Sequence, residues 1–190
     1  MNNNKWDLVI KSENNIFKFD FKSLWAYRDL LLLLVKRDYT SFYKQTILGP
    51  FWFFGQPLVT AFVYVFIFGR VAKLPTDEIP LPLFYITGIT AWVLFADIMR
   101  KTSTTFLDNI TVFSKVYFPR LIMPISGAIS SLIKYLFQLI LVLLIILIYN
   151  IIGNQVIPNT YLILFPFIIL VIMIQGLGFG LIIASITVKY

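Results

Sequence analysis

Residues 135–152 read YLFQLILVLLIILIYNII, a stretch without a single charged side chain. At the rise of an α-helix these residues measure about 27 Å, close to the roughly 30 Å of hydrocarbon in a bilayer. The stretch therefore predicts a membrane-spanning helix, which extends back to Pro124. Lys134 precedes it directly, and its long side chain can reach the headgroups from the inner boundary of the membrane. The alternative is that Lys134 takes part in a transport path.

The rest of the chain has the same apolar character. Of the 190 residues, 59% are hydrophobic and 13% are charged, whereas about 25% of a soluble domain is charged. One compact core of this size cannot bury so much apolar surface. Three further charge-poor stretches predict spans at about 47–68, 81–99 and 161–188, besides the one at 124–152. We therefore expect an all-α integral membrane domain over residues 47–190, after a cytosolic lead-in and interfacial amphipathic helix over residues 1–46.

Several kinds of chemistry are excluded by composition. The chain has no cysteine and no histidine, which removes disulfides, thiol nucleophiles, histidine bases and the usual zinc ligand sets. The sequence GLGFG at 176–180 lacks the Lys-Ser or Lys-Thr of a phosphate-binding loop. A membrane-embedded glycosyltransferase or acyltransferase would need clustered acids or a histidine base, and the only adjacent acidic pair, Asp77-Glu78, lies in a loop between prolines. We therefore expect a protein that is not an enzyme and binds no cofactor itself.

Loop charges predict the orientation. The region before the first span carries eight Lys or Arg against five acids, and residues 100–120 carry four against one. Residues 70–80 hold two charges of each sign, and residues 150–160 hold none. Because basic loops stay inside, both termini are expected in the cytoplasm of a multi-pass protein. The net charge of +7 gathers beside apolar spans, which favours membrane lipid and not nucleic acid as its partner. Residues 1–15 lack the apolar core of a cleavable signal.

Residues 24–38 predict a helix that lies in the membrane interface. Six apolar residues from Leu30 to Val35 are too few to cross a bilayer, and aromatic and basic residues flank them. The alternative is a helix packed on the cytosolic end of the bundle. The residues assigned to this interfacial segment are Trp25, Tyr27, Arg28, Lys36, Arg37, Tyr43 and Lys44.

Small residues predict where helices pack closely. Gly176, Gly180 and Ala184 recur every four residues, and Gly127 and Ser131 repeat the spacing in the third span, a pattern that lets helix backbones approach. Asp97 precedes Arg100 and Lys101 by three and four residues, so one helical face can hold these charges near the inner surface.

The segment between the second and third spans predicts a short rigid helix. Asp108 or Asn109 is a suitable N-cap, residues 110–117 follow, and Pro119 ends the helix because the residue before a proline avoids helical geometry. Pro124 would start the third span. Exposed Val112, Phe113, Val116 and Tyr117 on such an element suggest a docking site for a partner. An ordinary interhelical loop folded back on the bundle is the alternative.

The chain resembles the type-two ABC export permeases that move O-antigen, capsule or teichoic-acid chains. The resemblance covers nearly the whole chain, and its most specific runs are Tyr43-Lys44-Gln45-Thr46 with Leu48-Gly49-Pro50, and Lys115-Val116-Tyr117-Phe118-Pro119-Arg120. Further matching residues include Leu24-Trp25, Tyr27-Arg28-Asp29, Lys36-Arg37-Asp38, Trp52, Gln56-Pro57, Phe68-Gly69, residues 80–84, Gly88, Trp92, Asn109 and Pro124.

This resemblance implies a bacterial cytoplasmic-membrane permease for a lipid-linked glycan, working as a homodimer above two ABC ATPase subunits that bind ATP and Mg²⁺. It also implies that residues 109–120 form a coupling helix, which favours docking over the ordinary loop. The residues expected to contact the ATPase are Asn109, Val112, Phe113, Lys115, Val116, Tyr117, Phe118 and Arg120. Aromatic residues line the channel of such exporters, and the candidates in this chain are Trp52, Phe53, Tyr64, Tyr85 and Trp92. An exporter of drugs or lipids on the same scaffold is the alternative function.

Two departures from the family pattern shape these expectations. Members usually have six spans, whereas four are expected in this chain, so we expect it to be a fragment that does not transport unaided. Ser41-Phe42 also stands where a basic residue often precedes the Tyr-Lys-Gln-Thr run, which weakens a role of this segment in binding a phosphate headgroup.

Overall fold

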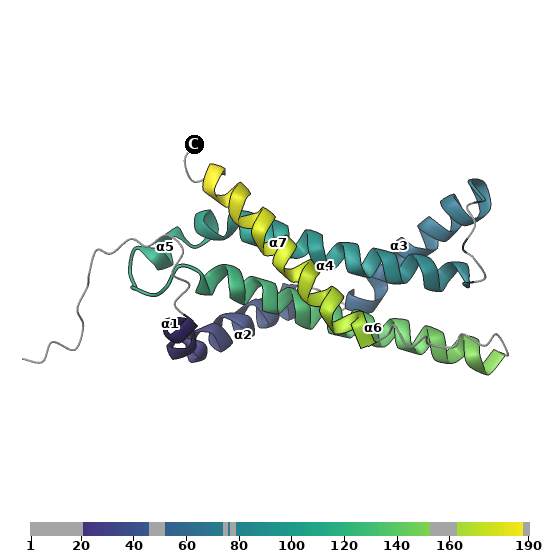
Figure 1. Ribbon diagram of the computed structural model, residues 1–190, viewed down its shortest axis with the longest axis horizontal. Coiled ribbons are helices and arrows are strands. Elements are labelled where there is room, and N and C mark those ends of the chain that lie inside the picture. The colour runs from purple at the N-terminus through teal and green to yellow at the C-terminus, as the bar shows by residue number, and fades with distance from the viewer. Residues whose placement is uncertain (1–20, 46–51, 74–75, 77–78, 153–162, 188–190) are drawn as a thin grey trace, which may run out of the picture.

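A computed structural model describes residues 21–45, 52–73, 76, 79–152 and 163–187, of which residues 21–23, 42–45, 52 and 53 are described by their backbone only. These residues form helices, and no strand occurs among them. Figure 1 shows an elongated bundle in which α4 (Leu81–Asp108) and α6 (Ile122–Ile152) run along the long axis. α3 (Trp52–Tyr64) lies toward one end, and the short α5 (Ile110–Phe113) lies at the other.

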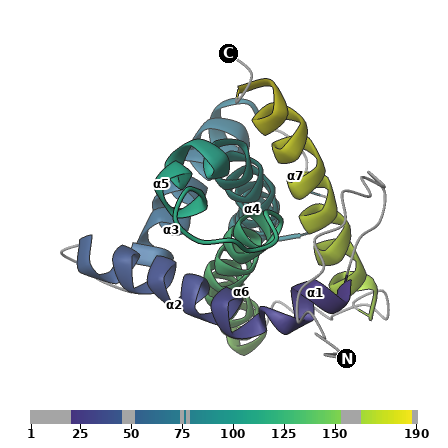
Figure 2. The same cartoon turned by 90° about the vertical axis from the view of Figure 1, so that its left-hand side faces the viewer.

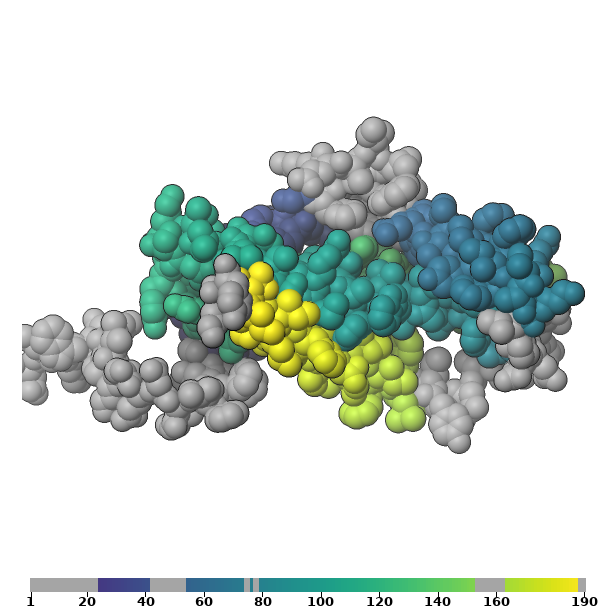
Figure 3. Space-filling view, turned by 90° about the horizontal axis from the view of Figure 1, so that it is seen from above, coloured from purple at the N-terminus to yellow at the C-terminus, as the bar shows by residue number. Residues whose placement is uncertain are grey.

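The remaining helices surround this central pair. α7 (Phe165–Thr187) crosses α4 obliquely, and α3 lies on the other side of α4 when the bundle is seen end on (Figure 2). α1 (Phe21–Ala26) and α2 (Arg28–Gln45) lie across the end that carries α5. Figure 3 shows the face on which α7 crosses between the α5 end and the α3 end.

Four helical segments are long and apolar enough to cross a membrane, as the sequence predicts. α3 continues as a π-helical segment, η2 (Val65–Val71), so the first span reaches slightly further than expected, while residues 47–51 lie outside the described ranges. α4 does not end near residue 99, where the second span was expected to stop. Arg100 and Lys101 end its apolar stretch without breaking the backbone hydrogen bonds, and the helix continues to Asp108.

Two apolar clusters hold the spans together. One lies between α3, α4 and α6 and is centred on buried Ala61, Ile86 and Val142. The other joins α4, α6 and α7 around Leu94, Ile98 and Tyr135. Large apolar side chains cover the outer faces of α6 and α7 and remain exposed, which is the arrangement expected of helices that are solvated by lipid.

The contact between α7 and α4 depends on the small residues. Gly176, Gly180 and Ala184 are all buried. A Cβ atom at Gly180 would lie 2.5 Å from Thr102 Cβ, and one at Gly176 would lie 2.9 Å from Ile98 Cγ2. No side chain fits at these positions without moving α7 away, so the backbones of α7 and α4 approach closely here. Gly127 and Ser131 are likewise buried on α6.

α2 combines the two placements considered for it. Leu34 and Val35 are buried, and the helix packs along α6, whereas its Leu32 and Leu33, and Trp25 of α1, are exposed. Apolar side chains on the exposed face suit the membrane interface. The helix is thus packed on the bundle by one face, and its outward face carries Leu32 and Leu33 beside the exposed charges of Lys36 and Arg37.

Candidate functional site in the loop between α4 and α6

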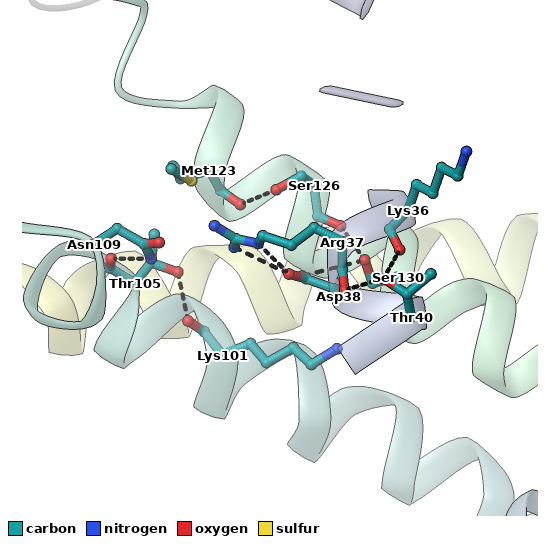
Figure 4. A network of polar contacts seen from close by, with 10 residues as sticks. All are labelled: Lys36, Arg37, Asp38, Thr40, Lys101, Thr105, Asn109, Met123, Ser126 and Ser130. Carbon is teal, nitrogen blue, oxygen red and sulfur yellow. Dashed lines mark hydrogen bonds and ion pairs between the residues drawn. The ribbon is translucent and has the colours of Figure 1, made fainter. Parts of the chain in front are cut away.

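The loop begins at Asn109, the predicted N-cap. Its backbone carbonyl accepts hydrogen bonds from the N–H groups of Val112 (3.0 Å) and Phe113 (3.1 Å), so Asn109 does start the next helix. Its side chain, however, does not cap that helix. Asn109 Nδ2 donates to the carbonyl of Thr105 at 2.9 Å (Figure 4), which satisfies an otherwise open acceptor at the end of α4. One residue therefore ends α4 and starts α5.

The helix in this loop is shorter than predicted. α5 ends at Phe113. Of the helix expected as far as Tyr117, only one further turn is present, and in it the N–H of Val116 donates to the Val112 carbonyl at 3.2 Å. α6 then begins two residues before Pro124, with the N–H of Ile122 bonded to the carbonyl of Pro119 at 3.0 Å. The short helix thus ends well before Pro119, which was expected to stop it, and the Pro119 carbonyl instead provides the first acceptor of α6.

The inner face of the loop is an aromatic stack. The rings of Phe113 and Phe118 are stacked with centroids 5.3 Å apart, and the ring of Phe106 on α4 lies 5.7 Å from that of Phe113. Phe118 is 5% exposed and contacts a buried cluster with Leu34 of α2 and Ile122 of α6. Phe118 was expected to contact a partner, and Val112 and Phe113 were expected to be exposed. Instead Phe118 is buried inside the chain, and the other two are half-buried against the same cluster.

The outer face of the loop carries a different set of side chains. Tyr117 is 83% exposed, Val116 is 57% exposed, and Lys115 and Arg120 are exposed beside them. Ile110, which the sequence analysis did not select, is 61% exposed. We call these five residues the outer rim of the loop. It joins apolar and cationic side chains on a backbone whose inner face is fixed by the aromatic stack.

A charged network lies about two to three helical turns from this loop along α4 and α6. Lys134 Nζ donates to Asp97 Oδ2 at 2.8 Å, and Arg100 Nη2 donates to Asp97 Oδ1 at 3.2 Å. The Lys134 and Asp97 side chains are only 16% and 14% exposed. The sequence placed Asp97 and Arg100 on one face, but it gave no sign of Lys134 as their partner, because the pair joins two helices that are far apart in the sequence.

The comparison with protein families settles what this bundle is. The family model described as ABC-2 type transporter matches residues 29–190, which include α2 and all four spans. The chain belongs to the ABC-2 type transporter family. With four helices that can span a membrane, it is a multi-pass membrane protein of a transporter family.

Individual relatives point the same way. The chain is 29% identical over 170 residues to the O-antigen export system permease protein RfbA of Myxococcus xanthus, covering 89% of this chain and 62% of that protein. It is also 29% identical over 123 residues to the protein of the same name from Klebsiella pneumoniae, covering 64% of this chain and 46% of that protein. The chain thus spans about half to three fifths of the length of the relatives it matches.

The interfacial residues of this ABC-2 domain are only partly brought together. Arg28 lies over the Trp25 ring, 5.7 Å from its centroid, and both side chains are exposed. Tyr27 is half-buried in the cluster under the loop. Lys36 is exposed, and Arg37 Nη2 pairs with Asp38 at 3.0 Å. The side chains of Tyr43 and Lys44 lie outside the described residues.

Of the five aromatic residues expected along a channel, the three whose side chains are described do not form one surface. Tyr64 and Tyr85 lie together, with ring centroids 6.4 Å apart, in a cluster with Phe68 of η2. Tyr85 is 9% exposed, so its ring serves packing in this chain, whereas Tyr64 is 40% exposed. Trp92 is separate from them and 66% exposed, with its ring beside Phe95. The side chains of Trp52 and Phe53 lie outside the described residues.

Proposed function

We propose that this chain is the permease part of an ATP-driven exporter that moves lipid-linked polysaccharide, of O-antigen, capsule or teichoic-acid type, across the bacterial cytoplasmic membrane. Family membership and the names of the two relatives support this assignment. Because the chain covers only part of those relatives, we assign the transport to a complete exporter, in which two permease copies work with two ABC ATPase subunits. ATP and Mg²⁺ are bound by those ATPase subunits.

The outer rim of the α4–α6 loop is proposed to contact the ATPase. The observation that carries this proposal is the contrast between its two faces: Phe118 is buried, while the adjacent Tyr117 is 83% exposed. An exposed aromatic residue on a braced backbone is typical of an interface anchor, since little entropy is lost when it binds. Movement of the ATPase would then pass through the aromatic stack to α2, α4 and α6 together.

The orientation that this proposal needs agrees with the loop charges. Four basic residues and one acid lie within residues 100–120, and basic loops are retained in the cytoplasm. The α5 end of the bundle would then be cytoplasmic, together with both termini, and the α3 end would face outward.

Tyr64 and Trp92 are proposed to contact the passing glycan, because both rings are exposed.

Charge reversal tests the docking surface. The variant Lys115→Glu/Arg120→Glu should insert normally in the membrane but lose association with the ATPase, and with it glycan export. The matched control is Arg70→Glu/Lys73→Glu, which reverses two exposed cations at the opposite end of the bundle and should leave association unchanged. Unchanged ATPase association and unchanged export in the first variant would rule out the docking role.

The cargo requires a separate test, since an exporter of drugs or lipids could use the same scaffold. The complete transporter should be purified from its native membrane, and the lipid extract analysed for glycan. We expect an ATPase subunit and a lipid-linked glycan to co-purify. An ATPase without any glycan would favour the drug or lipid exporter.

A further inference from the structure

A group of charges between α2, α4 and α6 is not explained by docking or by a glycan path. Lys101 lies on α4 one turn beyond Asp97, and its electrostatic neighbours are the carboxylates of Asp97 and Asp38 and the cations Lys134 and Arg100. Both carboxylates already have closer partners: Asp97 pairs with Lys134 and Arg100, and Asp38 pairs with Arg37. Within the described part of the chain, the Lys101 ammonium makes no ion pair or hydrogen bond.

The side chain of Lys101 is held in place along its stem. A Cβ atom built on Gly127 of α6 would lie 3.7 Å from Lys101 Cβ and 3.9 Å from Lys101 Cδ, which is ordinary van der Waals contact. The stem therefore rests on the bare backbone of α6, and the ammonium extends toward α2 (Figure 4). A half-buried cation fixed in this way has lost part of its hydration and favours an anionic partner.

The local balance of charge points to such an anion. The network holds two carboxylates, Asp38 and Asp97, and four cations, which are Arg37, Arg100, Lys101 and Lys134. An excess of two positive charges remains. The Ser130 hydroxyl, which lies 3.4 Å from Asp38 Oδ2, adds a hydrogen-bonding group at the same place.

The depth of Lys101 identifies the source of the anion. Lys134 directly precedes the apolar stretch of about 27 Å, so its pair with Asp97 marks the boundary of the hydrocarbon. Lys101 lies one helical turn beyond Asp97, about 6 Å toward the α5 end. Headgroups occupy roughly 5–7 Å on each side of the hydrocarbon. The backbone of Lys101 therefore lies within the headgroup layer, and its side chain extends back toward α2 and the carboxylates of Asp38 and Asp97.

We propose that Lys101, resting on Gly127 and supported by Arg37, binds the phosphate group of an anionic membrane lipid between α2, α4 and α6. The lipid would join the interfacial helix α2 to the two central spans at the end of the bundle that carries α5. This inference does not depend on the cargo or on an ATPase partner, because it requires only that the bundle lies in a bilayer.

The test uses the purified full chain in detergent, titrated with short-chain phosphatidylglycerol and followed by native mass spectrometry. Lys101→Gln should weaken lipid binding about fivefold or more, as expected for loss of one cation at a membrane surface. Lys101→Arg should retain binding. Lys36→Gln, which removes an exposed cation from α2, is the matched control and should bind like the wild type.

A second variant keeps the inference testable if Lys101→Gln folds poorly. Asp38→Asn removes a carboxylate that competes for Lys101 and should tighten lipid binding.

Competition with inorganic diphosphate separates the possible sources of the bound phosphate group. Displacement of the lipid indicates a site that recognises soluble phosphate as well, and no displacement indicates a lipid-specific site. Equal binding by wild type and a folded Lys101→Gln variant, or an equal loss in Lys36→Gln, would overturn the proposal, because binding would then reflect general surface charge.

Discussion

Lys134 Nζ lies 2.8 Å from Asp97 Oδ2, and this contact ties α6 to α4 where the apolar part of both helices ends. The two side chains are about equally shielded, at 16% and 14% exposure. A pair of this kind contributes little when compared with apolar residues, but removing Lys134 leaves the shielded Asp97 with only the exposed Arg100 as its ion-pair partner. The pair is therefore a point at which a single substitution should loosen the contact between α4 and α6.

Removal of Lys134 should destabilise the fold, and removal of the Asp97 charge in the same variant should restore most of the lost stability. We expect Lys134→Met to lower the free energy of unfolding by about 3 kcal/mol, and the double variant Asp97→Asn/Lys134→Met to recover most of it. Denaturation in mixed detergent, followed by circular dichroism, measures both. Arg100→Gln is the control, because its side chain is 74% exposed and should contribute less than about 1 kcal/mol. Equal stability of all variants would contradict the role of the pair.

The glycines of α7 provide a matched comparison. Gly180→Ala should destabilise the bundle by about 1–3 kcal/mol, because the added methyl group would meet Thr102 Cβ at 2.5 Å. Gly178 lies on the open side of the same helix with nothing within 4 Å of a built Cβ, so Gly178→Ala should be neutral or slightly stabilising. The same denaturation measurement compares them. If both variants lost equal stability, the cause would be a general effect of the added methyl group, such as altered lipid contact, rather than packing on α4.

Two adjacent residues of the loop should separate stability from docking. Phe118→Ala removes a buried ring from the stack with Phe113 and should cost about 3–5 kcal/mol. Tyr117→Ala should leave stability unchanged, since the side chain is 83% exposed, but should weaken binding of the ATPase. Thermal unfolding and pull-down of the ATPase subunit measure the two effects. A loss of stability in Tyr117→Ala would show that this ring packs on another part of the chain.

The exposed and buried aromatic residues of the spans should also behave differently. Trp92→Ala should reduce glycan export without a loss of folded protein, because the ring is 66% exposed. Tyr85→Ala should instead lower the amount of folded protein, since its ring is buried between Tyr64, Phe68 and Phe84. Export by cells and the yield of monodisperse protein are the two measurements. Normal export by Trp92→Ala would remove Trp92 from the proposed path.

Much of this arrangement follows from local pattern. The number of spans follows from the apolar stretches, and the close approach of α7 follows from Gly176, Gly180 and Ala184, because both depend on spacing within one helix. The position of Asn109 between two helices was also predictable. The direction of its side-chain hydrogen bond was not, because Thr105 and the next helix compete for the same amide.

What the sequence did not predict depends on contacts between distant segments. The burial of Phe118 follows from the position of α2, whose Leu34 closes over it. The spacing of Tyr27, Leu31 and Leu34 by three and four residues indicates one buried helical face, and this signal could have located the contact. The pairing of Lys134 with Asp97 has no such local signal, since it depends on the register between α4 and α6.

Docking of the outer rim on a cytoplasmic ATPase is the central claim, and the absence of cysteine from the chain allows a direct measurement of it. Tyr117→Cys and Ile151→Cys place a thiol at opposite ends of the bundle, at residues that are 83% and 76% exposed. Each should be introduced into the complete transporter and treated with a short bifunctional thiol cross-linker in membranes. We predict that Tyr117→Cys cross-links to the ATPase subunit and resists an impermeant maleimide in intact cells, while Ile151→Cys does not cross-link. Labelling of Tyr117→Cys from outside the cell, or cross-linking of the ATPase through Ile151→Cys alone, would contradict it.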